Sequence, residues 1–268
     1  SVLEAMFVKG HPALGCMLQE CFRMCGTLTQ LVAEKIYGPN YQPSSDDIAQ
    51  QRLRWQPQGE ESQLIEDCLD PEYPFVIVSV EGAKAGQVNL EEAQLTTELT
   101  VALNRGLTKL DGSRYDPYSL FYGDEQNPSG LFIVSPHHVQ IDALRRALEV
   151  EGFKQPFVDT VDKMQGQEAE CVFVSYGVSD AEYAMKEAEF IYIRNRLNVA
   201  VTRARTKVVL MVPRPLLDAP PEVLNSEVVL KGLDFLRHLY FRAAASERSQ
   251  HQYAGLDVEM VRLKELKS

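Results

Sequence analysis

The stretch FVDTVDKMQGQEAECVFVSYG, residues 157–177, and the stretch RNRLNVAVTRARTKVVLMV, residues 194–212, decide the fold. Residues 171–176 and 208–212 are nearly unbroken apolar runs, which are typical of parallel strands covered on both faces. Between the two runs, apolar residues recur at helical spacing, which predicts a helix with one apolar face: Leu197, Ala200, Val201 and Ala204. The whole stretch is therefore predicted to be a loop, a buried strand, a helix and a second buried strand.

Three arginines belong to the helical part of this pattern. On a helix of about 3.6 residues per turn, Arg196 and Arg203 lie together on one flank and Arg205 lies almost opposite them. Guanidinium groups held on a rigid helix beside strand ends can meet phosphate in a fixed bidentate geometry. The pattern therefore favours a phosphate site beside this helix.

Motifs in these stretches resemble those of a known family. TVDKMQGQE, residues 160–168, and RLNVAVTRAR, residues 196–205, resemble the fifth and sixth motifs of superfamily-1 helicases, in the Upf-like branch of the RNA-surveillance helicase and related DNA helicases. IVSPHHVQ, residues 133–140, resembles the fourth motif, and LQECFRMCGTLTQLVAEKIYG, residues 18–38, resembles the segment that opens the second motor domain. The resemblance covers residues 15 to 215 approximately.

The resemblance implies an α/β fold of the RecA-like kind, with three α/β/α layers around a mainly parallel sheet and a C-terminal helical tail. It implies that residues 1–215 form a second RecA-like domain, in which residues 40–74 are a loop or insertion on the surface. Residues 216–268 are expected to be a C-terminal helical extension.

Residue patterns predict further elements within this frame. A helix is expected over 13–37, strands over 75–80 and 131–135, and a helix that begins at Asn89. Glu92, three residues after Asn89, completes a capping box at that helix start.

The resemblance also implies the residues of a nucleotide cleft. Arg203 matches the arginine finger of the sixth motif, and Arg23 matches a second, nucleotide-contacting catalytic arginine. The other ATP-binding positions lie in the fifth motif, namely Gln165, Gly166 and Glu168. The helix is expected to place the Arg203 guanidinium at the carboxyl edge of the sheet, beside the bend of Gln165 and Gly166. Arg205, on the other flank, is expected to be a structural cation near the helix C-terminus.

Further positions match the family's contacts with single-stranded nucleic acid, from the fourth and fifth motifs: Ser135, Pro136, His137, Thr160 and Asp162. A helix N-terminus after Pro136 suits phosphate, because its free N–H groups point outward. His137 stands where the family usually has tyrosine. Asp162 is expected to orient a neighbouring group, because a carboxylate does not contact phosphate directly.

The phosphate-binding loop of a helicase, GxxxxGK[ST], is not in this sequence, because none of its 16 glycines is followed by lysine. Paired acidic residues for Mg²⁺ at the end of an apolar strand are not visible either. The simplest interpretation is the second RecA-like domain of a larger helicase, whose first RecA-like domain binds most of the ATP and Mg²⁺. This chain alone is then expected to hydrolyse no ATP.

Composition limits the class of protein. The net charge of −11 argues against nucleic-acid binding by bulk electrostatics, although lysines and arginines can still gather in a local groove. The sequence contains no apolar run of 18 residues, so no membrane span is predicted. The first residues do not resemble a secretory signal. The five cysteines lack the spacing of a disulfide framework or a metal site, which favours buried thiols in an intracellular, cytoplasmic or nuclear protein.

Two other functions fit parts of this sequence. The chain can be a non-catalytic RecA-like module for protein interaction or regulation, which suits its acidic balance and the 40–74 segment. Retention of Arg23, Gln165, Glu168 and Arg203 argues against that reading. A stand-alone single-strand binder is disfavoured because basic and aromatic residues are not interleaved. For the motor, both single-stranded DNA and single-stranded RNA remain open as partners.

Overall fold

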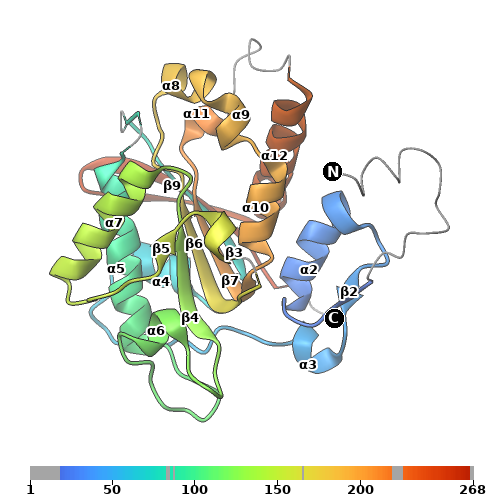
Figure 1. Cartoon of the computed structure of the whole chain (residues 1–268), viewed down its shortest axis with the longest axis vertical. Coiled ribbons are helices and arrows are strands. Elements are labelled where there is room, and N and C mark those ends of the chain that lie inside the picture. The colour runs from blue at the N-terminus through green and yellow to red at the C-terminus, as the bar shows by residue number, and fades with distance from the viewer. Residues whose placement is uncertain (1–18, 83–84, 87, 165, 219–225, 266–268) are drawn as a thin grey trace.

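The computed structural model describes residues 19–82, 85–86, 88–164, 166–218 and 226–265. Within these ranges the chain forms one large sheet in the order β5-β4-β6-β7-β3-β9-β8, shown in Figure 1. Its parallel part contains β5 (Val158–Asp159), β4 (Ser129–Val134), β6 (Ala169–Ser175), β7 (Ala204–Met211) and β3 (Phe75–Val80). Two antiparallel strands complete it beside β3, namely β9 (Leu256–Leu263) and β8 (Glu247–Tyr253).

Helices cover both faces of this sheet. Figure 1 shows α5 (Leu90–Gly106) and α7 (His138–Val150) on one side, with α10 (Arg194–Val201) and α12 (Glu227–Ser246) on the other. Strand β3 explains why both faces need a cover, since Phe75 and Ile77 enter one apolar core and Val76 and Val78 enter the other. The chain therefore has the predicted RecA-like three-layer α/β/α fold with a mainly parallel sheet.

The shorter elements complete the two helical layers and their connections. They are β1 (Glu20–Cys21), α2 (Gly26–Val32), the π-helical η2 (Ala33–Tyr37), β2 (Gln42–Pro43), α3 (Asp46–Ala49), α4 (Gln63–Leu69), α6 (Ser119–Tyr122), the 3-10 helical η3 (Val161–Met164), α8 (Ala181–Lys186), α9 (Ala188–Ile191) and α11 (Arg214–Leu217).

The start of α5 confirms the predicted cap. The Asn89 side chain accepts a hydrogen bond from the Glu92 backbone N–H over 3.0 Å, as a capping residue should. Both strands predicted from apolar runs near this helix are present, as β3 and β4.

The helix predicted over 13–37 is wrong in its first part, while residues 13–18 lie outside the described ranges. Residues 20–21 form a short strand beside β2, and α2 begins only at Gly26. The reason is a backbone anchor: the Cys25 N–H donates to the Arg205 carbonyl over 2.8 Å, and Cys25 is extended there (φ −57°, ψ 163°). A helical backbone at Cys25 is incompatible with that contact.

The prediction of a surface connection over 40–74 is also wrong. This segment contains α3 and α4, and it buries Leu53, Trp55 and Cys68 in the core beneath α5. The Trp55 indole N–H donates to the Ala102 carbonyl over 2.9 Å. Gly106 permits this approach, because a Cβ there would lie 2.6 Å from the indole nitrogen. The polar composition of the segment concealed these apolar anchors.

The predicted helical tail is confirmed by α12 but fails after it, because residues 247–263 form the β8–β9 hairpin. Ala254 and Gly255 both have positive φ (50° and 78°), as a two-residue hairpin turn requires. Along β8 the side chains alternate in exposure, and β9 pairs with β3 over six residue pairs. The boundary between residues 1–215 and an extension over 216–268 remains a prediction, and the sheet includes strands from both parts.

The helices in the described ranges include none that is long and apolar enough to cross a membrane. Cys21, Cys25, Cys68 and Cys171 are buried free thiols, in agreement with the interpretation of the cysteines.

Candidate functional site

The first group of site residues gathers where β6 and β7 begin. These neighbouring strands are parallel and paired at Ala169 and Ala204, so the residues before them, Glu168 and Arg203, lie at the same edge of the sheet. The N–H of Ala169 donates to the carbonyl of Arg203 over 3.1 Å. We call this the amino edge, because parallel strands start there.

Arg23 reaches the amino edge from a distant part of the chain. It lies between β1 and α2, in the loop that the Cys25 anchor fastens to β7. Its Nε donates to Oε2 of Glu168 over 2.8 Å, and its Nη1 donates to the carbonyl of Thr202 over 2.9 Å. The fold thus brings together two residues 145 positions apart in the sequence, both of which the resemblance assigns to the nucleotide cleft.

Glu168 is held between two arginines. Nη1 of Arg205 donates to its Oε1 over 2.7 Å, while Arg23 occupies Oε2. Burial alone would raise the pKa of Glu168, but the hydrogen bonds from Arg23 and Arg205 outweigh burial and hold that pKa below its usual value. Glu168 is therefore ionised at neutral pH, and both of its oxygens are occupied.

Arg203 has no carboxylate partner in the part of the chain that the structure describes. Its Nη1 is 3.5 Å from the carbonyl of Gln167, a weak contact, and its Nε is enclosed without a hydrogen-bond partner among the described residues. Burial lowers the pKa of Arg203, and the neighbouring positive charge of Arg23 lowers it further. An anion beside this guanidinium would relieve both effects.

The bend before β6 has the expected glycine conformation. Gly166 has φ +85°, a backbone conformation that side chains rarely adopt, and space is open where its Cβ would be. Gln165, the other predicted residue of the bend, lies outside the described residues. Arg23, Glu168 and Arg203 lie together at the amino edge, and Gly166 lies in the bend two residues before Glu168. Their role in ATP binding stays a prediction.

Two predictions about the arginines are wrong. Helix α10 ends at Val201, so Arg203 lies in the turn after it and Arg205 lies on β7, instead of on the helix. Arg196 and Arg203 are consequently near opposite ends of α10, and Arg203 lies at the amino edge instead of the carboxyl edge. The cause is the strand pairing of Ala204 with Ala169, which extends β7 toward its start beyond the apolar run 208–212.

The second group lies at the opposite, carboxyl edge, where β4 and β5 end. A pocket of about 300 Å³ opens there, and its lining includes four predicted nucleic-acid residues: Ser135, Pro136, Thr160 and Asp162. Ser135 itself is fully buried, and its hydroxyl accepts a long hydrogen bond of 3.4 Å from the His137 N–H. Asp162 is exposed, and its carboxylate lies 3.5 Å from Nη2 of Arg196; that it orients a neighbouring group stays a prediction.

His137 is not at the pocket surface. It is 7% exposed, and its ring lies 5.5 Å from the ring of Phe190 and 6.1 Å from the ring of Tyr183, centroid to centroid. Burial lowers its pKa, so the ring is neutral at pH 7. His137 therefore supports the aromatic wall of the pocket from behind.

Three residues near these sites escaped sequence reasoning. Gln51 hydrogen-bonds through its amide nitrogen to the carbonyls of Arg23 and Arg205, and its amide oxygen accepts from Nη2 of Arg205 over 3.3 Å. Phe190 and Arg196 line the carboxyl-edge pocket. Arg196 was recognised as a helix cation but not as a pocket residue, whereas Gln51 and Phe190 stand in segments without any motif.

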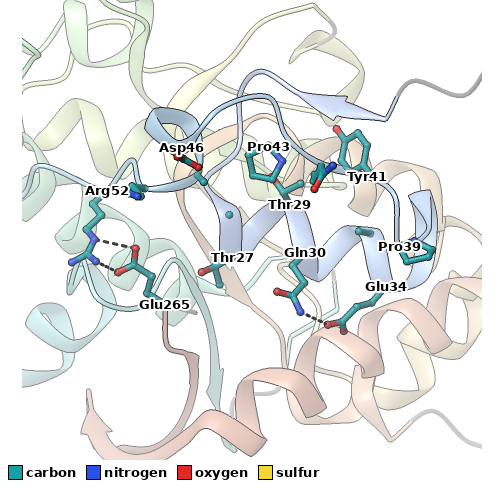
Figure 2. Close-up of a pocket in the computed structure, with 15 residues that line it drawn as sticks. Thr27, Thr29, Gln30, Glu34, Pro39, Tyr41, Pro43, Asp46, Arg52 and Glu265 are labelled. Carbon is teal, nitrogen blue, oxygen red and sulfur yellow. Dashed lines mark hydrogen bonds and ion pairs between the residues drawn. The ribbon is translucent and has the colours of Figure 1, made fainter. Parts of the chain in front are cut away.

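A separate hollow of about 1040 Å³ lies against α2 and β2, and its lining contains none of the predicted site residues. Figure 2 shows the ion pair of Arg52 with Glu265 at one end of it and the contact of Gln30 with Glu34 at the other. Arg52, the arginine among the described lining residues, is paired with Glu265, so these residues offer no unpaired cation for phosphate.

Comparison with known proteins identifies the family of the chain. A family model described as "AAA domain", the helicase domain of superfamily-1 helicases, matches residues 1–214. The chain belongs to this superfamily-1 helicase family. The predicted resemblance is thereby confirmed.

Several curated helicases are similar to the chain. The DNA replication ATP-dependent helicase/nuclease JHS1 of Arabidopsis thaliana is 23% identical over 211 residues, which is 76% of this chain and 14% of that protein. The DNA replication ATP-dependent helicase/nuclease DNA2 of Homo sapiens is 29% identical over 161 residues, 58% of this chain and 13% of that protein. The ATP-dependent helicase MJ0104 of Methanocaldococcus jannaschii is 24% identical over 210 residues, 76% of this chain and 27% of that protein. The chain thus spans a small part of the length of each relative.

Proposed function

We propose that this chain is the second motor domain of an ATP-dependent superfamily-1 helicase or translocase that acts on single-stranded DNA or RNA. The observation that carries the proposal is Arg203, a half-buried guanidinium without a carboxylate partner in the described ranges. It lies beside a carboxylate that Arg23 and Arg205 already occupy. The names of the similar proteins, which are ATP-dependent helicases, support the same class of activity.

The charges at the amino edge fit an anionic ligand of the phosphate class. Arg23 and Arg205 pair with one ionised carboxylate, Glu168. Arg205 also lies 3.5 Å from the buried Glu170, whose pKa burial raises in spite of Arg54 and Arg205, and Arg203 pairs with neither glutamate. The excess of positive charge is concentrated on Arg203. ATP with Mg²⁺ would supply a γ-phosphoryl group whose negative charge is spread over its oxygens during transfer.

Each side chain at the amino edge then has a distinct role. Arg203 donates to the phosphoryl oxygens as the arginine finger, and Arg23 adds a second positive charge to the cleft. Glu168 keeps Arg23 and Arg205 in place, and Gly166 lets the backbone approach the nucleotide. Gln165, which lies outside the described residues, is proposed as a further ATP contact from its place in the fifth motif.

A first RecA-like domain is the proposed partner that completes the cleft. It would supply the phosphate-binding loop, the Mg²⁺ ligands and the group that activates water, because the 268 residues contain no glycine followed by lysine. The isolated chain is accordingly expected to release no phosphate from ATP, with or without single strands.

The carboxyl edge is the proposed nucleic-acid surface. Pro136 and Thr160 would border the strand, Asp162 would orient Arg196, and Ser135 would hold the turn that precedes α7. Helix α10 lies between the two edges, with Arg196 in its first turn and Arg203 just beyond its last residue. When ATP binds and is hydrolysed, α10 would therefore transmit the movement of Arg203 to the strand-binding edge. The protein would advance along the strand in steps.

Phosphate release by the full parent protein tests this function. Replacement of Arg203 by alanine (Arg203→Ala) is expected to lower strand-stimulated ATP turnover by about 10³- to 10⁵-fold, the range known for arginine fingers. Thermal unfolding should change little, because Arg203 has no ion pair among the described residues. Normal strand-stimulated turnover in this variant would remove the finger assignment and leave the alternative, a non-catalytic RecA-like module.

A further inference from the structure

A groove of about 620 Å³ lies on the outer surface of the helical layer that contains α5 and α7 (Figure 1). It is lined by α5, by α7 and by residues of the segment 60–65, and we call it the α5 groove. Its described lining contains none of the residues assigned above to ATP or to nucleic acid. Along α5 it extends from Leu90 to Arg105, about 22 Å at 1.5 Å per residue, which is about four helical turns.

The floor of the α5 groove is made of small side chains. Ala93, Thr97 and Val101 recur every four residues, so they form one row on α5. Ala143 and Ala147 form a second row on α7. The Thr97 hydroxyl donates to the Ala93 carbonyl over 2.8 Å, so its hydrogen is already used within α5. Small side chains on two neighbouring helices leave room for a third helix to pack closely against both.

Two large apolar side chains belong to the same groove. Leu90 is 66% exposed and Val150 is 85% exposed, and both line it. They are the first residue of α5 and the last residue of α7. Because these helices follow the parallel strands β3 and β4, the two side chains lie toward opposite ends of the groove. A partner with an apolar face would remove both from water, which favours association.

The rim of the α5 groove is acidic. The described lining residues include four carboxylates, those of Glu60, Glu61, Glu98 and Glu151, and one arginine, Arg105, which pairs with Glu60 over 2.6 Å. Burial alone would raise the pKa of Glu61, but several backbone N–H groups donate to its carboxylate and hold that pKa below its usual value. Glu61 is therefore ionised at neutral pH. This excess of negative charge repels phosphate, whether from a nucleic acid or from a lipid headgroup.

Two enclosed oxygens at this surface accept no hydrogen bond from the described residues. One is Oε1 of Glu61. The other is Oδ1 of Asn104, in an adjoining hollow of about 190 Å³ that shares Val101, Arg105 and Glu151 with the groove. Both atoms are acceptors, so a ligand that satisfies them must supply donors. Lysine and arginine side chains supply donors together with positive charge, which also complements the acidic rim.

We propose that the α5 groove is a docking surface for a basic amphipathic helix of a partner protein. The apolar face of that helix would cover the small-residue floor together with Leu90 and Val150, and lysines or arginines on its flanks would meet the rim. The groove is separate from both edges of the sheet, so this partner is additional to the first RecA-like domain and to the single strand. The inference thus goes beyond the proposed function.

Peptide binding to the full parent protein tests the surface. The probe is a labelled helical peptide of about four turns, with leucine and alanine on one face and lysine on the other. One control peptide has the same composition in an order that forms no apolar face, and a second has glutamate in place of every lysine. Fluorescence anisotropy at physiological ionic strength should show that the basic amphipathic peptide binds about 10-fold or more tightly than either control.

Matched variants locate the bound peptide. Ala147→Gln puts a longer side chain on the floor and should weaken binding by about 10-fold or more. Ala245→Gln changes an exposed alanine of α12, on the other face of the sheet, and should leave the affinity unchanged. Glu151→Lys should weaken binding by about 3- to 10-fold, and by more at low salt. Glu149→Lys makes the same change of charge on α7 outside the described lining and should have a clearly smaller effect.

Val150→Ser keeps the test decisive if Ala147→Gln unfolds at a lower temperature than wild type. Val150 faces solvent, so its replacement should leave the fold intact and weaken peptide binding by about 3- to 10-fold. Equal affinity for the three peptides, or unchanged affinity in both Ala147→Gln and Val150→Ser, would overturn the docking surface. Equal losses in Glu149→Lys and Glu151→Lys would also overturn it, because they would indicate attraction by overall charge. Strand-stimulated ATP hydrolysis is measured without peptide, so the proposed function would survive each of these results.

Discussion

The two edges of one sheet have opposite chemistry. At the amino edge, Arg23 and Arg205 form ion pairs of 2.7–2.8 Å with Glu168, beside Arg203, which has no ion pair within the described ranges. At the carboxyl edge, an apolar pocket lies beneath a single cation, Arg196. Fixed charges suit a site where negative charge develops, whereas shape and apolar surface suit a ligand recognised by its flat face. Under the proposed function, ATP would bind at the amino edge and the single strand at the carboxyl edge, and α10 would connect the two sites.

Two glutamates sharpen the same contrast. Glu168 is ionised because arginines compensate for its burial. Glu92, at the carboxyl edge, is 1% exposed and accepts hydrogen bonds of 2.8 Å from the Ser175 hydroxyl and the Gly177 N–H. Burial raises the pKa of Glu92 to about 7, and these two hydrogen bonds only partly oppose the rise. The same residue type is thus stabilised as an anion at one edge and as a neutral acid at the other.

After Arg203→Ala, the largest effect is expected from Arg23→Ala in the parent protein. Loss of one positioned cation that stabilises transition-state charge costs about 10²- to 10³-fold in turnover, or about 3–4 kcal/mol. The affinity for single strands should stay the same, because Arg23 lies at the amino edge. Phosphate release and strand binding are measured in parallel. Arg52→Ala is the matched control, since it also removes an arginine from an ion pair (Figure 2) but away from either edge. A loss of strand affinity in Arg23→Ala would break the separation of the two edges.

A smaller effect is expected from Glu92→Gln, which should change how the free energy of unfolding depends on pH. In the wild type the folded-state pKa of about 7 lies above the usual value of 4.5, so the folded protein holds this proton more tightly than the unfolded chain. This contribution is fully present below pH 4.5 and is lost as the pH rises through 7, by about 3 kcal/mol in total.

Urea unfolding of the chain between pH 5 and pH 8 measures this loss. The Glu92→Gln variant should lack the part of the loss in unfolding free energy that comes from Glu92. Glu91 is the neighbouring carboxylate on α5, and the Glu91→Gln variant should show the same loss as the wild type. Identical pH profiles for wild type and Glu92→Gln would show that Glu92 does not titrate in this range.

The smallest effect, with the opposite sign, is expected for Glu168→Gln. The pKa of Glu168 is depressed, so its contribution is present above the usual value of 4.5 and is lost as the pH falls below it. Since the side chain is 35% exposed, solvent screens the ion pairs and the loss at pH 7 should be about 1 kcal/mol. Urea unfolding at pH 7 and pH 4 is the measurement. A loss that is as large at pH 4 as at pH 7 would mean that packing, not charge, dominates at this edge.

The sequence motifs drew attention to the amino-edge residues, but the helix and strand that carry Arg203 and Arg205 were predicted in the wrong place. Strand β3 and the Asn89 cap followed from apolar pattern and capping chemistry, both of which are local. The motifs assigned Arg23 and Glu168 to one nucleotide cleft, although no local pattern links residues so far apart, but they did not predict the ion pair between the two side chains. The end of α10 was misplaced because Ala204 suits a helix face as well as a strand, and only its pairing with Ala169 decides between them.

Other residues and elements near the site could not be recognised, because their local sequence is the same as that of a polar loop or a charged tail. Gln51 and Trp55 act through tertiary contacts with Arg205 and Ala102. The β8–β9 hairpin was concealed because β8 (ERSQHQY) is polar along almost its whole length, so that its alternating exposure appears only in the structure. Phe190 needed the fold to bring α9 over the ends of the strands.

The most direct measurement is a structure of the parent protein with a single strand and ADP–aluminium fluoride, a mimic of the transferring phosphoryl group. We expect the Arg203 guanidinium at hydrogen-bond distance, about 3 Å, from the fluoroaluminate, and the strand at the carboxyl edge beside Phe190. Arg203 still directed at the Gln167 carbonyl, with the nucleotide bound elsewhere, would contradict the division of work between the two edges.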